Sequence, residues 1–169
     1  SLAKASQVLD EPLYHQAAIN AAKFVLKELC SSGSLQRYWR TKPSRQPAYA
    51  EDYAAFIFGL IELYQSDFDS TWLEQALHIQ KQLDAQFWDP TLGGYFQENG
   101  KDTSLIVRTK QQYDGVVPSS NSLAAYNLLR LYALCGDEQM RTKVEQIFSL
   151  YAETLQKNPS SLKFMLVAL

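Results

Sequence analysis

The sequence predicts an all-α fold, an α/α toroid in which helical hairpins stack side by side. One observation is a repeat: Asp10, Asp69 and Asp137 each follow an apolar helical run and precede an amphipathic one. The spacing of about 60 residues suits one helical hairpin per repeat, each burying its apolar face against its neighbours. The other observation is that runs apolar nearly all round alternate with runs apolar on one side. This alternation is typical of an inner and an outer ring of helices.

The inner helices are expected at residues 2–9, 53–64 and 123–134. The second and third of these runs are apolar on almost every side, which is typical of helices that have neighbours on most faces. A further apolar run at the end of the sequence, residues 162–169, is expected to begin another inner helix. We therefore expect about three hairpins, forming a single domain over residues 1–169 that is a fragment of a larger toroid.

The outer helices are expected at residues 13–30, 70–88 and 137–157. In the 70–88 run, apolar side chains recur every three or four residues and so form one stripe. That stripe consists of Trp72, Ala76, Ile79, Leu83 and Phe87. Short polar residues precede each outer helix and can accept hydrogen bonds from its first N–H groups. The expected caps are Asp10, Ser70 and Asp137.

Two long connections, residues 31–49 and 89–120, lead from an outer helix to the next inner helix. Loops of this length in a compact domain are usually functional, so we expect a site at the end of the toroid where they lie. Within 89–120, the turn signal Asn99-Gly100 separates residues 95–97 from residues 105–108 and predicts a small β-hairpin. One of the polar residues at 119–122 is expected to cap the following helix.

Composition excludes several classes of protein. Of the 169 residues, 46% are hydrophobic, too many for a disordered chain, and the net charge of −2 gives no bulk attraction to nucleic acid or membrane. No stretch reaches the roughly 18 apolar residues of a spanning helix. Cys30 and Cys135 are far apart in sequence and lack Cys-x-x-Cys spacing, so we expect no metal site and no redox centre. Because Cys30 ends an outer helix and Cys135 ends an inner helix at the opposite end of the toroid, we also expect no disulfide between them. No cofactor is expected. The expected location is cytoplasmic.

Four motifs carry a family resemblance. They are Glu51-Asp52-Tyr53-Ala54, the residues 87–96 that read FWDPTLGGYF, Val107-Arg108-Thr109-Lys110, and the residues 114–122 that read DGVVPSSNS. In this order they resemble the C-terminal region of the thioredoxin-domain-containing, spermatogenesis-associated protein family. The resemblance implies a six-hairpin domain similar to sugar 2-epimerases and six-hairpin glycosidases, with a thioredoxin-like domain upstream. The family's usual Asp-Asp pair is Glu51-Asp52 here, and Ser120 stands where glycine is common.

Three carboxylates are candidates for catalysis: Glu51, Asp52 and Asp114. Carboxyl groups that converge from two loops could serve as acid and base on a sugar, with a chemistry set by their separation. The structural alternative is that Glu51 and Asp52 stabilise the dipole of the helix they open, and that Asp114 belongs to a turn.

Further side chains at the same end of the toroid are candidates for ligand binding, because aromatic rings stack on sugars and cations hold anionic groups. These candidates are Trp39, Tyr53, Arg108, Lys110, Ser119 and Asn121. Four of them have a structural alternative: Trp39 as a loop anchor, Arg108 in an ion pair with Asp114, and Ser119 and Asn121 as helix caps. Four further cations, Arg37, Arg40, Lys42 and Arg45, are expected to form a solvated rim, and His15 and His78 are expected on the surface.

Three functional hypotheses follow. The first is a partial six-hairpin domain with a binding or scaffolding role and no complete active site in this chain. The second is a carbohydrate-active domain, epimerase- or hydrolase-like, with its site among the long loops. The third is a protein-interaction solenoid. A sugar or a small anionic ligand is the expected small partner, nucleic acid and membrane are not expected, and exposed end helices are expected to cause self-association.

Overall fold

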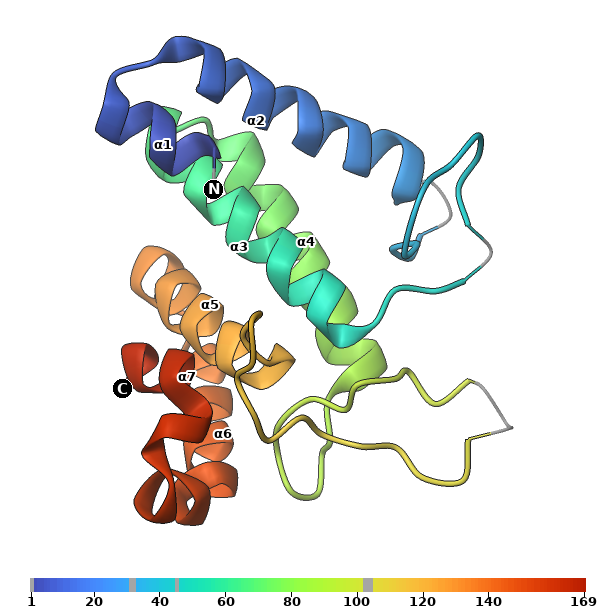
Figure 1. Ribbon diagram of the computed structural model, residues 1–169, viewed down its shortest axis with the longest axis vertical. Coiled ribbons are helices and arrows are strands. Elements are labelled where there is room, and N and C mark those ends of the chain that lie inside the picture. The colour runs from blue at the N-terminus through green and yellow to red at the C-terminus, as the bar shows by residue number, and fades with distance from the viewer. Residues whose placement is uncertain (1, 31–32, 45, 102–104) are drawn as a thin grey trace. The chain divides into compact units, whose positions relative to one another are not determined.

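The computed structural model describes residues 2–30, 33–44, 46–101 and 105–169, and it is helical throughout its regular parts (Figure 1). The α-helices are α1 (Leu2–Leu9), α2 (Pro12–Phe24), α3 (Ala50–Asp67), α4 (Ser70–Phe87), α5 (Ser120–Cys135), α6 (Glu138–Lys157) and α7 (Lys163–Ala168). A π-helical turn, η1 (Val25–Leu29), extends α2, and a 3-10 turn, η2 (Pro159–Leu162), precedes α7. The chain divides into two compact units, Ser1–Gln82 and Leu83–Leu169, which are described separately.

The predicted order of helical hairpins is confirmed. Helices α1–α2, α3–α4 and α5–α6 are three successive hairpins, and α7 follows them. Of the helices expected to be inner, α3 and α5 bury residues on most of their faces, whereas α1 buries only Ala3 of its described residues. Helix α6, expected to be outer, buries a single stripe. None of the helices formed by the described residues combines the length and hydropathy needed to cross a bilayer.

In the first unit, α1 packs against α2 and α3, and α2 also packs against α3. Helix α3 supplies the centre of this packing with side chains that are fully buried, among them Ile57, Leu60 and Ile61. It ends at Phe68, whose φ of 59° is left-handed and whose N–H donates to the Tyr64 carbonyl oxygen. This geometry terminates the helix and turns the chain into α4.

In the second unit, α5 packs against both α6 and α7. Helix α5 buries Leu128 and Leu131, and α6 contributes Ile147 and Tyr151 to the same core. The Tyr151 hydroxyl donates to the Gln111 carbonyl oxygen at 2.8 Å, and burial raises its pKa well above the ordinary value. The helical core of this unit therefore also fixes part of the long loop that precedes α5.

Two of the predicted caps are confirmed. The Ser119 side chain accepts a hydrogen bond from the Ser122 N–H at the start of α5, and the Asp137 carboxylate accepts one from the Gln139 N–H at the start of α6. Each satisfies a backbone donor that the helix itself cannot pair.

The other two caps are wrong by one residue. Helix α4 is capped by Asp69, whose carboxylate accepts the Thr71 N–H at 2.9 Å, rather than by Ser70. Helix α2 is capped by Glu11, which accepts the Leu13 N–H at 3.2 Å. Asp10 instead adopts a left-handed φ of 52° at the end of α1. Because Pro12 occupies the first turn of α2, the cap falls on the residue directly before it.

The small β-hairpin predicted in residues 89–120 does not form strands in the described residues, which contain only isolated bridges such as Trp88 with Tyr95. A backbone hydrogen bond from the Gln97 N–H to the Thr109 carbonyl oxygen, at 2.7 Å, connects the first predicted strand segment to the residue that follows the second. Beside this bond, the Arg108 guanidinium donates to the Glu98 carbonyl oxygen. The Arg108 side chain therefore links the two sides of this turn where a continuous backbone ladder is lacking in the described residues.

Candidate functional site

Asp52 lies in the first turn of α3, where its carboxylate accepts the Tyr49 N–H at 2.8 Å and so caps the helix. Burial raises the pKa of Asp52, while the hydrogen bond from Tyr49 and the charge of Arg37 act in the opposite direction. Glu51 lies 3.5 Å from the Arg37 guanidinium, which stacks 3.9 Å above the Tyr49 ring centroid. Both carboxylates therefore stabilise the start of α3. Their catalytic role stays a prediction.

The aromatic candidates of the first unit anchor its long loop. The Tyr53 hydroxyl is buried and accepts the Leu35 N–H at 2.9 Å. Trp39 is half-buried and stacks on Phe24 of α2, with ring centroids 5.9 Å apart. These contacts agree with the structural alternative of a loop anchor, and they leave part of the Trp39 ring accessible.

The basic side chains of the same loop are divided. Arg40 and Lys42 are exposed, as expected for a solvated rim, whereas Arg37 is held by Glu51 and Tyr49. Arg45 lies outside the described residues.

Asp114 is buried in the second unit, and both of its carboxylate oxygens accept backbone hydrogen bonds. Oδ1 accepts the Ser119 N–H at 2.7 Å, and Oδ2 accepts the Phe164 N–H at 2.8 Å and the Met165 N–H at 3.4 Å. The Asp114 N–H donates to the Ser161 carbonyl oxygen at 2.6 Å. Negative charge is favourable beside the free N–H groups of helix starts, so this carboxylate ties the loop to the beginnings of α5 and α7.

Arg108 and Lys110 are both engaged within the loop. Arg108 donates to the carbonyl oxygens of Glu98 and Gln86 and lies 4.1 Å from the Phe96 ring centroid. The predicted ion pair between Arg108 and Asp114 is therefore wrong, because both groups bind backbone atoms instead. Lys110 pairs with a carboxylate that the sequence did not single out: its Nζ lies 2.7 Å from Asp89 and 2.7 Å from the Gly93 carbonyl oxygen.

Asn121 connects α5 to the loop through two hydrogen bonds to one residue. Its Oδ1 accepts the Tyr95 N–H at 2.7 Å, and its Nδ2 donates to the Tyr95 carbonyl oxygen at 2.9 Å. Ser119, the other polar candidate here, caps α5 and is buried. Both candidates therefore have structural partners, and a ligand-binding role for either stays a prediction.

A second polar cluster was missed by reasoning from the sequence. Asp84 on α4 accepts the Tyr95 hydroxyl at 2.6 Å and pairs with Lys143 on α6 at 2.5 Å. Lys143 also lies 5.5 Å from the Trp88 ring centroid. Asp84 falls off the apolar stripe of its helix, a position that usually predicts a solvated side chain, so the sequence carried no signal for this cluster.

No protein-family model matches the chain. Spermatogenesis-associated protein 20 from Rattus norvegicus is 37% identical over 163 residues, which cover 90% of this chain and 21% of that protein. The Homo sapiens protein of the same name gives the same identity and coverage. The chain is homologous to spermatogenesis-associated protein 20. It spans about a fifth of the length of these relatives.

The fold has solved counterparts. Cellobiose 2-epimerase from Bacillus thermoamylovorans superimposes with a TM-score of 0.66 at 18% identity, over 89% of this chain and 41% of that one. The cellobiose 2-epimerase from Spirochaeta thermophila gives a TM-score of 0.65 at 17% identity, over 89% and 40%. These likenesses confirm the α/α toroid fold. They also fit the resemblance of the sequence to the spermatogenesis-associated family.

Three of the four motifs that suggested this homology to spermatogenesis-associated protein 20 contact one another within the second unit. Lys110 of the VRTK motif binds Asp89 and Gly93 of the preceding motif, and Asn121 of the last motif binds Tyr95. Gly94 has a φ of +76°, and a Cβ there would lie 3.1 Å from the Asn121 Oδ1. The motif residues therefore hold the conformation of the loop that leads into α5.

The histidines differ from each other. His78 is exposed, as predicted, and its ring lies 3.0 Å from the Gln82 side chain. His15 is half-buried with its Nε2 3.2 Å from Asp67, so the expectation of a solvent-exposed side chain is wrong for it. In the part of the chain that the structure describes, no group of three or more His, Cys, Asp or Glu side chains is placed to hold a metal ion.

Both cysteines are free thiols, and both are expected to react slowly. Burial raises the pKa of Cys30 to about 11, and burial together with the charge of Asp137 raises the pKa of Cys135. Since the thiolate is the nucleophile, we expect alkylation of Cys30 by iodoacetamide near neutral pH to be about 100-fold slower than for an ordinary cysteine.

Peptide mass spectrometry after timed alkylation measures this rate, with the urea-unfolded chain as the control. Cys30 should react faster as the pH rises toward its pKa. Equal rates in the folded and unfolded chain would contradict the prediction. A non-reduced monomer lighter by two hydrogens would separately contradict the expectation that Cys30 and Cys135 form no disulfide.

Proposed function

We propose that this chain is part of a six-hairpin helical domain with a binding or scaffolding role and without a complete active site of its own. The observation that supports this proposal is the use of Asp114. Its carboxylate is buried and accepts three backbone hydrogen bonds, two of them at the start of α7. A general acid or base needs a lone pair that is open to its substrate, and three of the roughly four lone-pair sites of this carboxylate already accept backbone hydrogen bonds.

The other candidate groups support the same proposal. Asp52 caps α3, Arg108 binds two backbone carbonyl groups, and Lys110 is paired with Asp89. Side chains that form the hydrogen bonds needed by backbone groups in loops and at helix ends stabilise the fold. By the sequence resemblance alone, we further propose that the complete protein carries a thioredoxin-like domain upstream, which mass spectrometry of the native gene product would test.

The alternative proposal is a carbohydrate-binding role, favoured by two observations. The fold is shared with cellobiose 2-epimerases, and Trp39 remains partly accessible after stacking on Phe24. In addition, burial raises the pKa of Asp52, and a raised pKa is what a carboxyl group requires to donate a proton to a sugar oxygen.

One titration separates the two proposals. Cellobiose is added to the isotope-labelled chain, and backbone amide chemical shifts are followed by NMR. The scaffold proposal expects no saturable shift. Saturable shifts that disappear in Trp39→Ala and Asp52→Asn, but persist in the control Glu74→Gln on the exposed side of α4, would establish sugar binding instead.

We also propose that the chain self-associates through its end helices. On α1, Val8 and Leu9 are 70% and 63% exposed, and on α7, Val167 is 64% exposed. Apolar side chains gathered at a surface favour contact with a partner.

We expect sedimentation velocity to show reversible association at high micromolar concentration, and we expect Val8→Ser to weaken it. The control is Leu92→Ser, since Leu92 is 66% exposed and lies outside the end helices. A monomer at every concentration would refute the proposal.

A further inference from the structure

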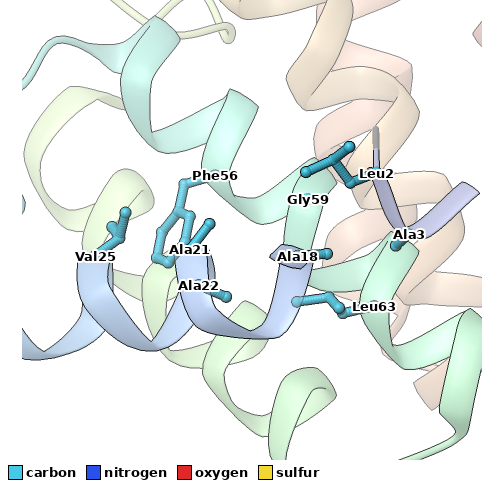
Figure 2. A pocket seen from close by; sticks show the side chains of 9 residues that line it. All are labelled: Leu2, Ala3, Ala18, Ala21, Ala22, Val25, Phe56, Gly59 and Leu63. Atoms are coloured by element: carbon cyan, nitrogen blue, oxygen red, sulfur yellow. The ribbon is translucent and has the colours of Figure 1, made fainter. Parts of the chain in front are cut away.

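Helix α2 leaves an open apolar groove against α1 and α3, lined by small residues such as Ala18, Ala22 and Gly59 (Figure 2). Nothing in the described residues indicates what covers this groove. The loop that joins η1 to α3, residues 31–49, differs because some of its exposed side chains are charged. Charge restricts the chemistry of a partner, so this loop is the surface of the first unit that indicates which kind of partner it fits.

In its described part, this loop is folded back on itself. The Arg37 N–H donates to the Gln46 carbonyl oxygen at 3.1 Å. Closer to the tip, the Ser44 N–H donates to the Tyr38 carbonyl oxygen at 2.9 Å. These bonds between the two arms of the loop set the backbone before a partner arrives, and a preorganised backbone lowers the entropy cost of binding. Residues 40–42 form the tip between the two arms.

The tip carries two cations whose side chains are not paired. Arg40 and Lys42 are exposed, and neither forms an ion pair with any residue that the structure describes. The Arg40 N–H donates to the Lys42 carbonyl oxygen at 3.2 Å, which holds the two residues in one tight turn. Residues 31–49 contain no Asp or Glu, although acidic residues outnumber basic ones in the whole chain, 18 to 16. The tip is therefore a local positive charge on an acidic chain.

Arg40 differs in this respect from the other described arginines. Each of those is engaged by a carboxylate, a carbonyl group or an aromatic ring: Arg37, Arg108, Arg130 and Arg141. A guanidinium is a planar fork of N–H donors that matches the geometry of a carboxylate, and such pairs are among the stronger hydrogen-bonded contacts. The Arg40 side chain is thus placed to bind a carboxylate from outside the described chain.

Aromatic rings of the same part of the first unit are also accessible. Tyr38, in the loop, is 49% exposed. Phe24, at the end of α2, is 45% exposed and stacks on the half-buried Trp39 with ring planes 22° apart. Aromatic and arginine side chains are the residues enriched in protein interfaces, where buried rings supply most of the binding energy.

We propose that the loop tip and the Phe24–Trp39 stack bind an acidic peptide segment of a partner protein, with an apolar residue among its carboxylates. This inference names a partner for the binding role proposed above and rests on that role. Exposed ion pairs contribute only about 0–1 kcal/mol each, so Arg40 and Lys42 supply selectivity for acidic segments and the aromatic stack supplies the apolar contact. A single-stranded nucleic acid also suits cations beside aromatic rings, but its continuous negative backbone is repelled by a chain of net charge −2.

The test follows the fluorescence anisotropy of a short fluorescein-labelled peptide of acidic residues around one central phenylalanine. We expect saturable binding that weakens as sodium chloride is raised, because salt screens exposed charges. In the double variant Arg40→Gln, Lys42→Gln, affinity should fall about tenfold, as expected for the loss of two exposed ion pairs. The control double variant Arg141→Gln, Lys157→Gln removes the same charge from exposed positions on α6, and its affinity should change by less than about twofold.

A further variant tests the aromatic part of the surface. Trp39→Ala removes one ring of the stack and should weaken peptide binding several-fold without changing its dependence on salt. Circular dichroism checks that each variant keeps its fold, which is expected for Arg40 and Lys42 because their side chains are exposed and unpaired within the described chain.

Three results would overturn the inference. They are equal affinity for a peptide with glutamine in place of each acidic residue, equal affinity in the loop and α6 variants, and tighter binding of a labelled oligothymidine of equal charge. The last result would make the loop a nucleic-acid site instead. Absence of peptide binding would overturn this inference alone, because the scaffold proposal is decided separately by the cellobiose titration.

Discussion

Asp114→Ala is expected to lower the free energy of unfolding by about 3 kcal/mol, because it removes the acceptor for three backbone donors at once. The N–H groups of Ser119 and Phe164, at 2.7 and 2.8 Å from the carboxylate, would lose their partner in a buried setting. A loss of this size is a large share of the roughly 5–15 kcal/mol that stabilises a typical domain. Asp114→Asn should cost less, since its amide oxygen can still accept from one of the two helix starts.

Urea unfolding followed by circular dichroism measures this effect. The matched control is Asp137→Ala, which also removes an aspartate cap but one that is exposed and accepts a single hydrogen bond from the Gln139 N–H. Its cost should be about 1 kcal/mol. If the two alanine variants lost the same stability, Asp114 would not be the link between the loop, α5 and α7 that its contacts indicate.

Breaking the pair between Asp89 and Lys110 is the second change with a large expected effect. Their side chains are only 10% and 12% exposed, so Lys110→Met would leave a nearly buried carboxylate without its cation. We expect a loss of about 3 kcal/mol, and a double-mutant cycle with Asp89→Asn should show that much of it is coupling between the two residues. The exposed pair of Lys157 and Glu153 is the control, and Lys157→Met should change stability by no more than about 0.5 kcal/mol.

The same pair predicts a pH dependence. The hydrogen bond from Lys110, and then that from the Thr91 N–H, lowers the pKa of Asp89 below its ordinary value. A carboxyl group whose pKa is lowered by folding stabilises the protein above its unfolded pKa, near 3.9, and loses that contribution as the pH falls through the folded value. The wild-type chain should therefore lose more stability between pH 5 and strong acid than Lys110→Met does, and parallel urea midpoints for the two proteins would contradict this.

The helices were predictable because their signals are periodic and local. The all-round apolar runs that became α3 and α5, and the stripe of α4, follow from the spacing of side chains that each helix buries. The positions of two caps were predicted wrongly by one residue, at Asp10 and Ser70. Several polar residues precede each helix, and the backbone conformation decides which of them caps it.

The loop contacts were less predictable. Asp114 meets Phe164 across 50 residues, and Lys143 meets Asp84 across 59, so no spacing in the sequence relates these partners. The sequence did identify Asp52, Asp114, Lys110 and Asn121 as candidate functional residues. Whether each one caps a helix, binds a loop or contacts a ligand depends on the backbone groups beside it, and these are positioned only when the fold is complete.

The two hydrogen bonds between Asn121 and Tyr95 have a consequence for mutational tolerance. Asn121 pairs with the backbone of its partner, as a neighbouring strand would, and therefore leaves the identity of that partner open. In a saturation library, position 121 should accept almost no other residue, not even aspartate, which lacks the donor for the Tyr95 carbonyl group. At position 95, substitutions should be limited by side-chain packing and by the hydrogen bond to Asp84, not by the contact with Asn121. Positions 121 and 95 would therefore show very different substitution profiles.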